Sequence, residues 1–159
     1  MSSSQIENPI VGIVVALQTC PGYRKPMIPH DVLSLQENLG IIGDKHAIAD
    51  SYRQVLAMEK ETLDALGLSI GLIKENITTL NIDLMALKHK QHVSFGKDVI
   101  LEAVKACAPC SRMEEIRPGL LRELAGKRGM LFRVMRGGDV RLGDAIRILE
   151  SDIQSGRGQ

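Results

Sequence analysis

The chain has 159 residues, 44% of them hydrophobic and 25% charged, which is typical of one globular domain with room for a core. Twenty basic against nineteen acidic side chains give a net charge of +1, which excludes a global electrostatic attraction to nucleic acid or to a membrane surface. With two Phe, two Tyr and no Trp, the sequence also lacks the aromatic side chains on which single-stranded nucleic acid stacks.

The expected location is the cytoplasm. The apolar run at residues 10–17 is too short to span a bilayer, and the Ser-rich start lacks the pattern of a secretory signal peptide. Three cysteines without a disulfide framework fit a reducing compartment. No repeat or linker divides the chain, so we expect one domain at 10–150 between flexible tails at 1–9 and 151–159.

The first part of the chain predicts two strands. The β-branched run at 10–17 indicates a buried strand, and the turn signal and prolines after it indicate an extended, irregular segment. Residues 40–46 follow, where two glycines permit unusual backbone angles around a short strand. In an extended chain Asp44 and His46 project on the same side, although a turn or a hydrogen-bonded surface pair also explains them.

The middle of the chain predicts two further strands and a helix. Residues 53–58 indicate a strand that runs into a short helix from about Glu59. Residues 71–80 have the β-branched content of a strand, but Glu75 and Asn76 interrupt its apolar pattern. Polar residues at a strand centre need partners or a site to serve, and a solvated edge strand is the alternative.

The last part predicts more short strands. Residues 93–95 alternate as a strand, and a helix is expected at 118–125, with proline in its first turn. Residues 130–136 and 140–142 flank two glycines and an aspartate, a signal for a β-hairpin, and 145–149 form the last strand. About seven to nine strands, two short helices and no repeated βαβ unit predict a mainly β fold, a closed or highly curved β-barrel.

The stretch with the most chemical potential is 105–112. Pro109 has no backbone N–H and fixes its own φ, so a strand ends there and Cys110 stands at the start of a loop. The cations of Lys105 and Arg112 favour the thiolate, which is the form that attacks sulfur or binds metal. Cys110 is therefore the predicted reactive thiol.

Other interpretations of these cysteines are open. A free cysteine is most often a small buried hydrophobe. Cys107-x-x-Cys110 has the spacing of half a zinc site or of a redox pair, but zinc needs a second ligand pair and Cys20 stands alone. A redox dithiol of the thioredoxin kind opens a helix, and Pro118 follows residues 113–115 too closely to leave room for one.

Six clusters occur in one order along the chain. They are Gly40-x-x-Gly43-Asp44-Lys45-His46, Arg53-Gln54-Val55, Glu75-Asn76-Ile77, Pro109-Cys110-Ser111-Arg112, Gly119-Leu120-Leu121 and Gly138-Asp139-Val140-x-x-Gly143-Asp144. In this order and spacing the sequence resembles the molybdenum cofactor sulfurase C-terminal (MOSC) domain family, from about residue 10 to residue 149. The resemblance implies a β-rich barrel, here standing alone rather than fused to a pyridoxal-phosphate-dependent desulfurase.

The resemblance also assigns the candidate site. Cys110 matches the family's functional thiol, which is proposed to carry sulfur as a persulfide or to ligate molybdenum. The candidate cofactor-binding residues are Asp44, His46, Arg53, Glu75, Asn76 and, beside the thiol, Arg112. We expect at least three of the first five to line one cavity with the Cys110 sulfur.

Two functions of different classes follow from the resemblance. In the first, the chain is a sulfur carrier or molybdenum cofactor-binding module: Cys110 takes sulfur from a cysteine desulfurase-type donor and passes it to a metal-cofactor enzyme. Pyridoxal phosphate would belong only to the donor. In the second, Cys110 holds molybdenum of a molybdopterin cofactor and the domain reduces N-hydroxylated compounds.

The module is the preferred function. A phosphate-bearing pterin needs a large basic pocket, which the sequence does not reveal, and the related reductases have an additional N-terminal segment. A partner-binding domain without chemistry is a third function, and an inert, buried Cys110 would favour it. Nothing in the sequence indicates an oligomeric state.

Overall fold

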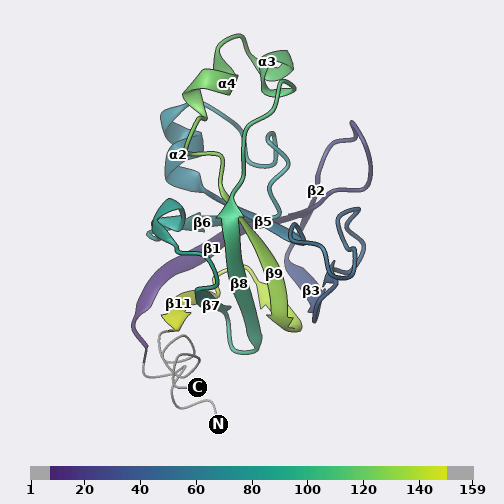
Figure 1. The fold of residues 1–159 in the computed structure, drawn as a ribbon, viewed down its shortest axis with the longest axis vertical. Helices are drawn as coiled ribbons and strands as arrows, with labels where there is room; N and C mark the ends of the chain where they lie inside the picture. The colour runs from purple at the N-terminus through teal and green to yellow at the C-terminus, as the bar shows by residue number, and fades with distance from the viewer. Residues whose placement is uncertain (1–7, 150–159) are drawn as a thin grey trace.

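The computed structural model describes residues 8–149, and within them seven strands close into a barrel (Figure 1). The order around the barrel is β1 (Ile10–Thr19), β11 (Ala145–Leu149), β7 (His92–Phe95), β8 (Val99–Ala106), β9 (Met130–Arg136), β5 (Val55–Glu59) and β6 (Ile77–Leu80). Pairing of β6 back to β1 completes the circle, so the predicted β-barrel is confirmed. The neighbouring strands are antiparallel except for β5 and β6.

The barrel interior is filled by alternating side chains. Along β8, Val99, Leu101 and Ala103 are buried, while the residues between them are only partly covered. Phe95 and Phe132 meet edge to face at the centre, with ring centroids 5.9 Å apart. Burial of each such side chain contributes about 1.5–3 kcal/mol, which makes this layer a main source of the barrel's stability.

A second, smaller sheet lies against the barrel. It consists of β10 (Gly138–Arg141), β3 (Val32–Gln36) and β4 (Gly40–Ile41), and a further short strand, β2 (Ile28–His30), pairs with β1. The predicted hairpin between 130–136 and 140–142 is therefore wrong, because β10 pairs with β3 rather than with β9. A Cβ on Gly137 would lie 2.5 Å from the Leu35 carbonyl oxygen, so this glycine serves the close approach to β3.

The predicted strand at 71–80 is shorter than expected. Only Ile77–Leu80 pairs as a strand, and the preceding residues form a turn with positive φ at Gly71 and Lys74. The turn is closed by the buried carboxylate of Glu75, whose Oε2 accepts a 2.7 Å hydrogen bond from the backbone N–H of Gly71. The polar break in the sequence thus marks a turn rather than a strand centre.

The helices gather at the end of the barrel toward which β8 runs (Figure 1). The two expected helices are present as α2 (Lys60–Ala65) and α4 (Leu120–Glu123), and a 3-10 turn, η1 (Leu84–Ala86), lies elsewhere. The expectation that no helix follows the cysteine motif is wrong: α3 (Met113–Ile116) forms one turn there, and the Glu114 carboxylate accepts the N–H groups of the α4 start.

A second apolar cluster fastens these helices to the barrel. Its buried members are Met58, Leu63, Leu68, Ile73, Met113, Leu120 and Leu124. Because Met113 belongs to this cluster, the loop that carries Cys110 is anchored three residues beyond the thiol. No helix within residues 8–149 is long and apolar enough to cross a membrane. The predicted tails lie outside the described residues except for positions 8 and 9.

Candidate functional site

Cys110 is exposed on the loop that connects β8 to α3. The chain stays beside the β9 side of the barrel one residue past β8, because the N–H of Cys107 donates to the Gly129 carbonyl at 2.8 Å. The Cys110 carbonyl then accepts the N–H of Met113 at 2.9 Å and begins the α3 turn. The thiol is thereby presented at the helical end of the barrel, where it lines a cavity of about 420 Å³.

Positive charge dominates this cavity, which we call the thiol cavity. Six basic side chains and one carboxylate stand among the described residues that line it: Arg24, Lys45, Arg53, Lys74, Arg112, Arg128 and Glu115. The carboxylate is already paired, since Arg24 Nη1 lies 2.9 Å from Glu115 Oε1. Arg112 and Lys45 stack on the Tyr23 ring at 5.1 and 5.5 Å from its centroid. The cavity therefore suits an anionic ligand.

Arg128 is the most deeply placed of these cations. It is 5% exposed, and its Nη2 donates to the Ile73 carbonyl at 2.5 Å. Among residues 8–149, its Nε and Nη1 find no hydrogen-bond partner. Burial lowers the pKa of Arg128, an effect that charge interaction with Cys107 opposes. A guanidinium stays protonated in proteins, so the unpaired N–H groups of Arg128 can donate hydrogen bonds to an anion at the cavity wall.

All three cysteines of the chain line the thiol cavity. Cys20 is far from the other two cysteines in the sequence, but the fold places it at the same cavity. Cys107 is buried, with its Sγ 4.0 Å from Arg53 Nη1. None of the three is in a disulfide, and residues 8–149 contain no group of three or more His, Cys, Asp or Glu placed to hold a metal ion. All three are therefore free thiols in the part of the chain that the structure describes.

The structure brings three of the predicted cofactor-binding residues to Cys110: His46, Arg53 and Arg112 line the thiol cavity with it. His46 is half-buried and reaches the wall from the loop after β4. Arg53 precedes β5, and Arg112 lies two residues past the thiol. These side chains come from segments far apart in the sequence, as convergence on one site requires.

Asp44, Glu75 and Asn76 do not line the thiol cavity, so two of the five expected residues do so rather than at least three. Asp44 is buried behind His46, whose N–H donates to Asp44 Oδ2 at 2.9 Å and whose Nδ1 lies 3.1 Å from the same oxygen. The N–H of Cys20 donates to the other oxygen at 2.6 Å. Burial raises the pKa of Asp44, but the hydrogen bonds from His46 and Cys20 outweigh it and the pKa is lowered.

Asn76 joins three segments behind the wall. Its Nδ2 donates to Asp44 Oδ1 at 3.0 Å and to the Gln18 carbonyl at 3.2 Å, and its Oδ1 accepts the N–H of Leu56 at 3.0 Å. Its buried polar atoms are thus satisfied by the backbone of β1 and β5. Asn76 and Asp44 thus hold the segments that carry Cys20 and His46.

Glu75 supports the opposite wall. Its carboxylate is fully buried, and burial raises its pKa. Oε2 accepts from Gly71 and from the Thr78 hydroxyl, while Oε1 has no hydrogen-bond partner. The turn that it closes carries Leu72 and Lys74, both of which line the thiol cavity. Glu75 is therefore also a positioning residue.

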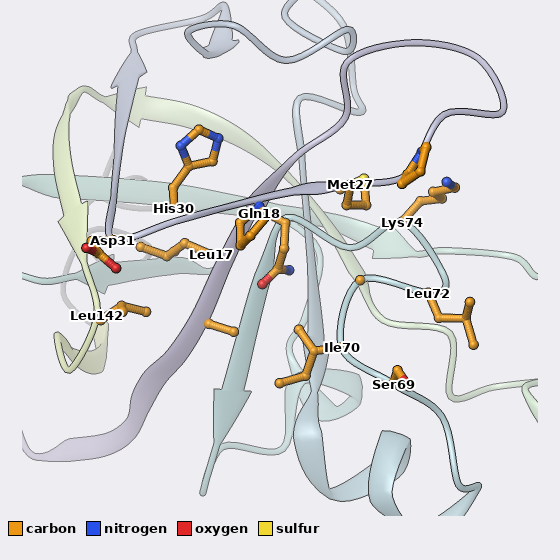
Figure 2. A pocket seen from close by; sticks show the side chains of 14 residues that line it. Leu17, Gln18, Met27, His30, Asp31, Ser69, Ile70, Leu72, Lys74 and Leu142 are labelled. Atoms are coloured by element: carbon orange, nitrogen blue, oxygen red, sulfur yellow. The ribbon is translucent and has the colours of Figure 1, made fainter.

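A larger cavity of about 750 Å³ shares part of its lining with the thiol cavity, and Figure 2 shows the side chains that line the larger one. Leu72 and Lys74 line both, so the 71–74 turn separates them. The walls of the larger cavity are mainly apolar, with Leu17, Met27, Ile70 and Leu142 among them. It contains no thiol and none of the predicted site residues. The predicted reactive thiol and the predicted site residues that line a cavity are therefore found at the smaller, basic one.

Sequence reasoning missed most of the basic wall. Arg24, Lys45 and Lys74 come from turns, where a cation is usually only solvated. Arg128 had one signal, because it stands between two glycines just before an apolar strand. A Cβ on Gly129 would lie 2.5 Å from the Ala57 carbonyl oxygen, so the glycine brings the Arg128 segment against β5.

The barrel agrees with the comparisons. The MOSC domain profile matches residues 43–147, and the chain therefore belongs to the MOSC domain family. Among solved structures, the chain resembles the YuaD protein from Bacillus subtilis, with a TM-score of 0.71 and 19% identity over 89% of this chain and 97% of that one.

Two further structures have the same fold. YiiM from Escherichia coli matches with a TM-score of 0.68 and 15% identity, over 87% of this chain and 70% of that one. YiiM from Geobacillus stearothermophilus matches with a TM-score of 0.60 and 18% identity, over 89% and 74%. A search among curated proteins finds no match. At these identities the likenesses establish the fold.

Proposed function

We propose that this MOSC domain is a sulfur carrier and molybdenum cofactor-binding module, with Cys110 as its working thiol. The observation that supports this most is the exposed Cys110 on a cavity with six basic side chains. A thiolate, a persulfide anion and the phosphate of a pterin cofactor are all negatively charged. The same wall stabilises each of them.

Sulfur loading follows ordinary thiolate chemistry. The Cys110 thiolate attacks the outer sulfur of a persulfide on a cysteine desulfurase-type donor, the S–S bond of the donor breaks, and the donor cysteine leaves as a thiolate. Cys110 then carries the outer sulfur as a persulfide, ready for a metal-cofactor enzyme as acceptor. Arg112, two residues away on the cavity wall, neutralises the anion before and after transfer.

The same residues fit a molybdopterin-type cofactor. Cys110 would ligate the metal as a soft thiolate, and Arg128 with Arg53 would hold an anionic group of the cofactor. The two unpaired nitrogens of Arg128 are the structural support for this fit. When bound, the cofactor would supply two-electron redox chemistry.

Two measurements test the proposal. Mass spectrometry of the reduced chain after exposure to a small-molecule persulfide should find the additional sulfur on Cys110, and Cys110→Ser should abolish it. Elemental analysis of protein purified under reducing, molybdenum-replete conditions should find molybdenum that the same variant lacks. A Cys110→Ser variant that retains both sulfur and molybdenum contradicts the proposal.

The second candidate function is a reductase of N-hydroxylated compounds. The sequence argued against it because it revealed no basic pocket for a phosphate-bearing pterin, and the basic thiol cavity removes that objection. Reduction of a hydroxylamine by molybdenum-loaded protein with a chemical electron donor tests it. A domain without chemistry is disfavoured by the exposure of Cys110, since an inert thiol would be buried.

A further inference from the structure

We propose that Cys107 is a second working thiol: it converts a persulfide on Cys110 into a Cys107–Cys110 disulfide and thereby releases the carried sulfur as sulfide. This inference rests on the proposed sulfur-carrier function and gives that site an additional outcome. Its starting observation is that both cysteines line the thiol cavity.

Cys107 and Cys110 are close along the chain and in the fold. Two residues separate them, so their Cα atoms are at most about 11 Å apart, and the loop that carries Cys110 has to bring them to the roughly 5.5 Å that a disulfide needs. Cys107 is fixed by its backbone hydrogen bond to Gly129, whereas Cys110 lies on the loop.

The surroundings of Cys107 differ from those of an inert core thiol. It packs against Leu56 and Leu131, yet its Sγ lies 4.0 Å from Arg53 Nη1. Arg128 interacts electrostatically with Cys107 and Cys110, and two of its nitrogens lack a hydrogen-bond partner although the side chain is 5% exposed. A buried small hydrophobe needs no cations, whereas an attacking thiolate does.

The reaction balances without another oxidant. The Cys107 thiolate attacks Cys110 Sγ of the persulfide, the bond from Cys110 Sγ to the outer sulfur breaks, and a Cys107–Cys110 bond forms. The outer sulfur takes the bonding electron pair and leaves as hydrosulfide. The negative charge of the hydrosulfide is balanced by the proton that Cys107 released when it became a thiolate. The outer sulfur is reduced to sulfide and the Cys107 sulfur is oxidised, while the Cys110 sulfur keeps its oxidation state. A small dithiol then reduces the disulfide and restores the pair.

The sequence offers a direct assay. Trypsin cleaves after Lys105 and Arg112, so both cysteines fall in the single peptide 106–112. The full-length reduced chain is exposed to inorganic polysulfide without oxygen, and excess donor is removed by gel filtration. Sulfide is measured over time, and the chain is then alkylated, digested and analysed by mass spectrometry.

We expect peptide 106–112 to contain an internal disulfide and therefore to be two hydrogens lighter than the reduced peptide. We also expect one sulfide to be released for each disulfide formed. An untreated chain kept under the same conditions should stay reduced. A persistent persulfide on Cys110 beside a free Cys107 overturns the inference and leaves the carrier function standing. A chain that takes up no sulfur on Cys110 overturns both.

Variants give a second measure. Cys107→Ser should keep the Cys110 persulfide and release no sulfide. Cys20→Ser removes the third thiol of the cavity, whose Sγ donates to the Gly22 carbonyl at 3.6 Å, and should still form the Cys107–Cys110 disulfide, which shows that Cys107 and not Cys20 attacks. Sulfide release by Cys107→Ser at the rate of the unaltered chain contradicts the inference. The disulfide measured in the unaltered chain decides the question should Cys107→Ser fail to fold.

Discussion

Asn76 donates a 3.0 Å hydrogen bond to Asp44, and this bond links the start of β6 to the loop that carries His46. Neither side chain lines the thiol cavity, and both are buried. The pair shows how the site is built, because a buried polar layer holds the loops whose outer side chains form the basic wall.

Removal of this layer should reduce stability rather than only binding. We expect Asn76→Ala to lower the free energy of unfolding by about 1–3 kcal/mol, because it leaves the N–H of Leu56 and an oxygen of Asp44 without their partner. Urea unfolding followed by circular dichroism measures the change. Glu37→Ala, at an exposed position, is the control and should cost less than about 0.5 kcal/mol. Equal free energies of unfolding for the two variants would show that the hydrogen bonds of Asn76 do not stabilise the fold.

The pH dependence of stability should reflect Glu75. Burial raises the folded-state pKa of Glu75 above its unfolded value of about 4.3, so ionisation disfavours the folded state. Between the unfolded pKa and the folded pKa, the stability contribution of this group is lost as pH rises. The free energy of unfolding of Glu75→Gln minus that of the unaltered chain should therefore increase as the pH rises above about 4.5. Urea titrations at pH 4 and pH 7 measure it, and a pH-independent difference contradicts it.

Asp44 acts with the opposite sign. Its pKa is lowered in the folded chain, so its contribution is present above the unfolded value of about 3.9 and is lost as pH falls through the folded pKa. Asp44→Asn should remove part of the acid-induced loss of stability below about pH 4. The same titrations extended to pH 2.5 show it, and an unchanged acid midpoint would assign that loss to other carboxylates.

The accessibility of the thiols is a further prediction. Cys110 is exposed while Cys20 and Cys107 are buried, so iodoacetamide at neutral pH should label Cys110 first. The other two should react more slowly in the folded chain, and as fast as Cys110 once the chain is unfolded in urea. Mass spectrometry of tryptic peptides after brief labelling reports the order. Earlier labelling of Cys20 would mean that the cavity opens to solvent beside Cys20 rather than beside Cys110.

Part of the barrel could be predicted from sequence because some strands alternate apolar and polar residues, as residues 93–95 of β7 do. The pairing of β10 with β3 could not, since two glycines after a strand signal a hairpin and also permit close approach to another strand. The strand content of Val32–Gln36 was hidden by the prolines before it.

The candidate site was predicted in part, for an analogous reason. A polar residue in an apolar pattern shows that a buried polar group needs partners, but not whether they are backbone groups or a ligand. For Asn76 they are backbone groups and Asp44, whereas Arg53 reaches the thiol cavity. Arg128 was missed because a cation before a strand is usually solvated, and its burial depends on the glycine after it.

Arg128 provides the sharpest test of anion binding at the thiol cavity. Its side chain is 5% exposed with two unpaired nitrogens, whereas its neighbour Lys127 is exposed and outside the cavity. Arg128→Met and Lys127→Met remove the same charge from adjacent positions. Inorganic phosphate that binds the folded chain raises its melting temperature by mass action. We expect this rise in the unaltered chain and in Lys127→Met, and its loss in Arg128→Met. Calorimetry at constant ionic strength measures the three melting curves, and an equal rise in both variants would show that the anion binds elsewhere.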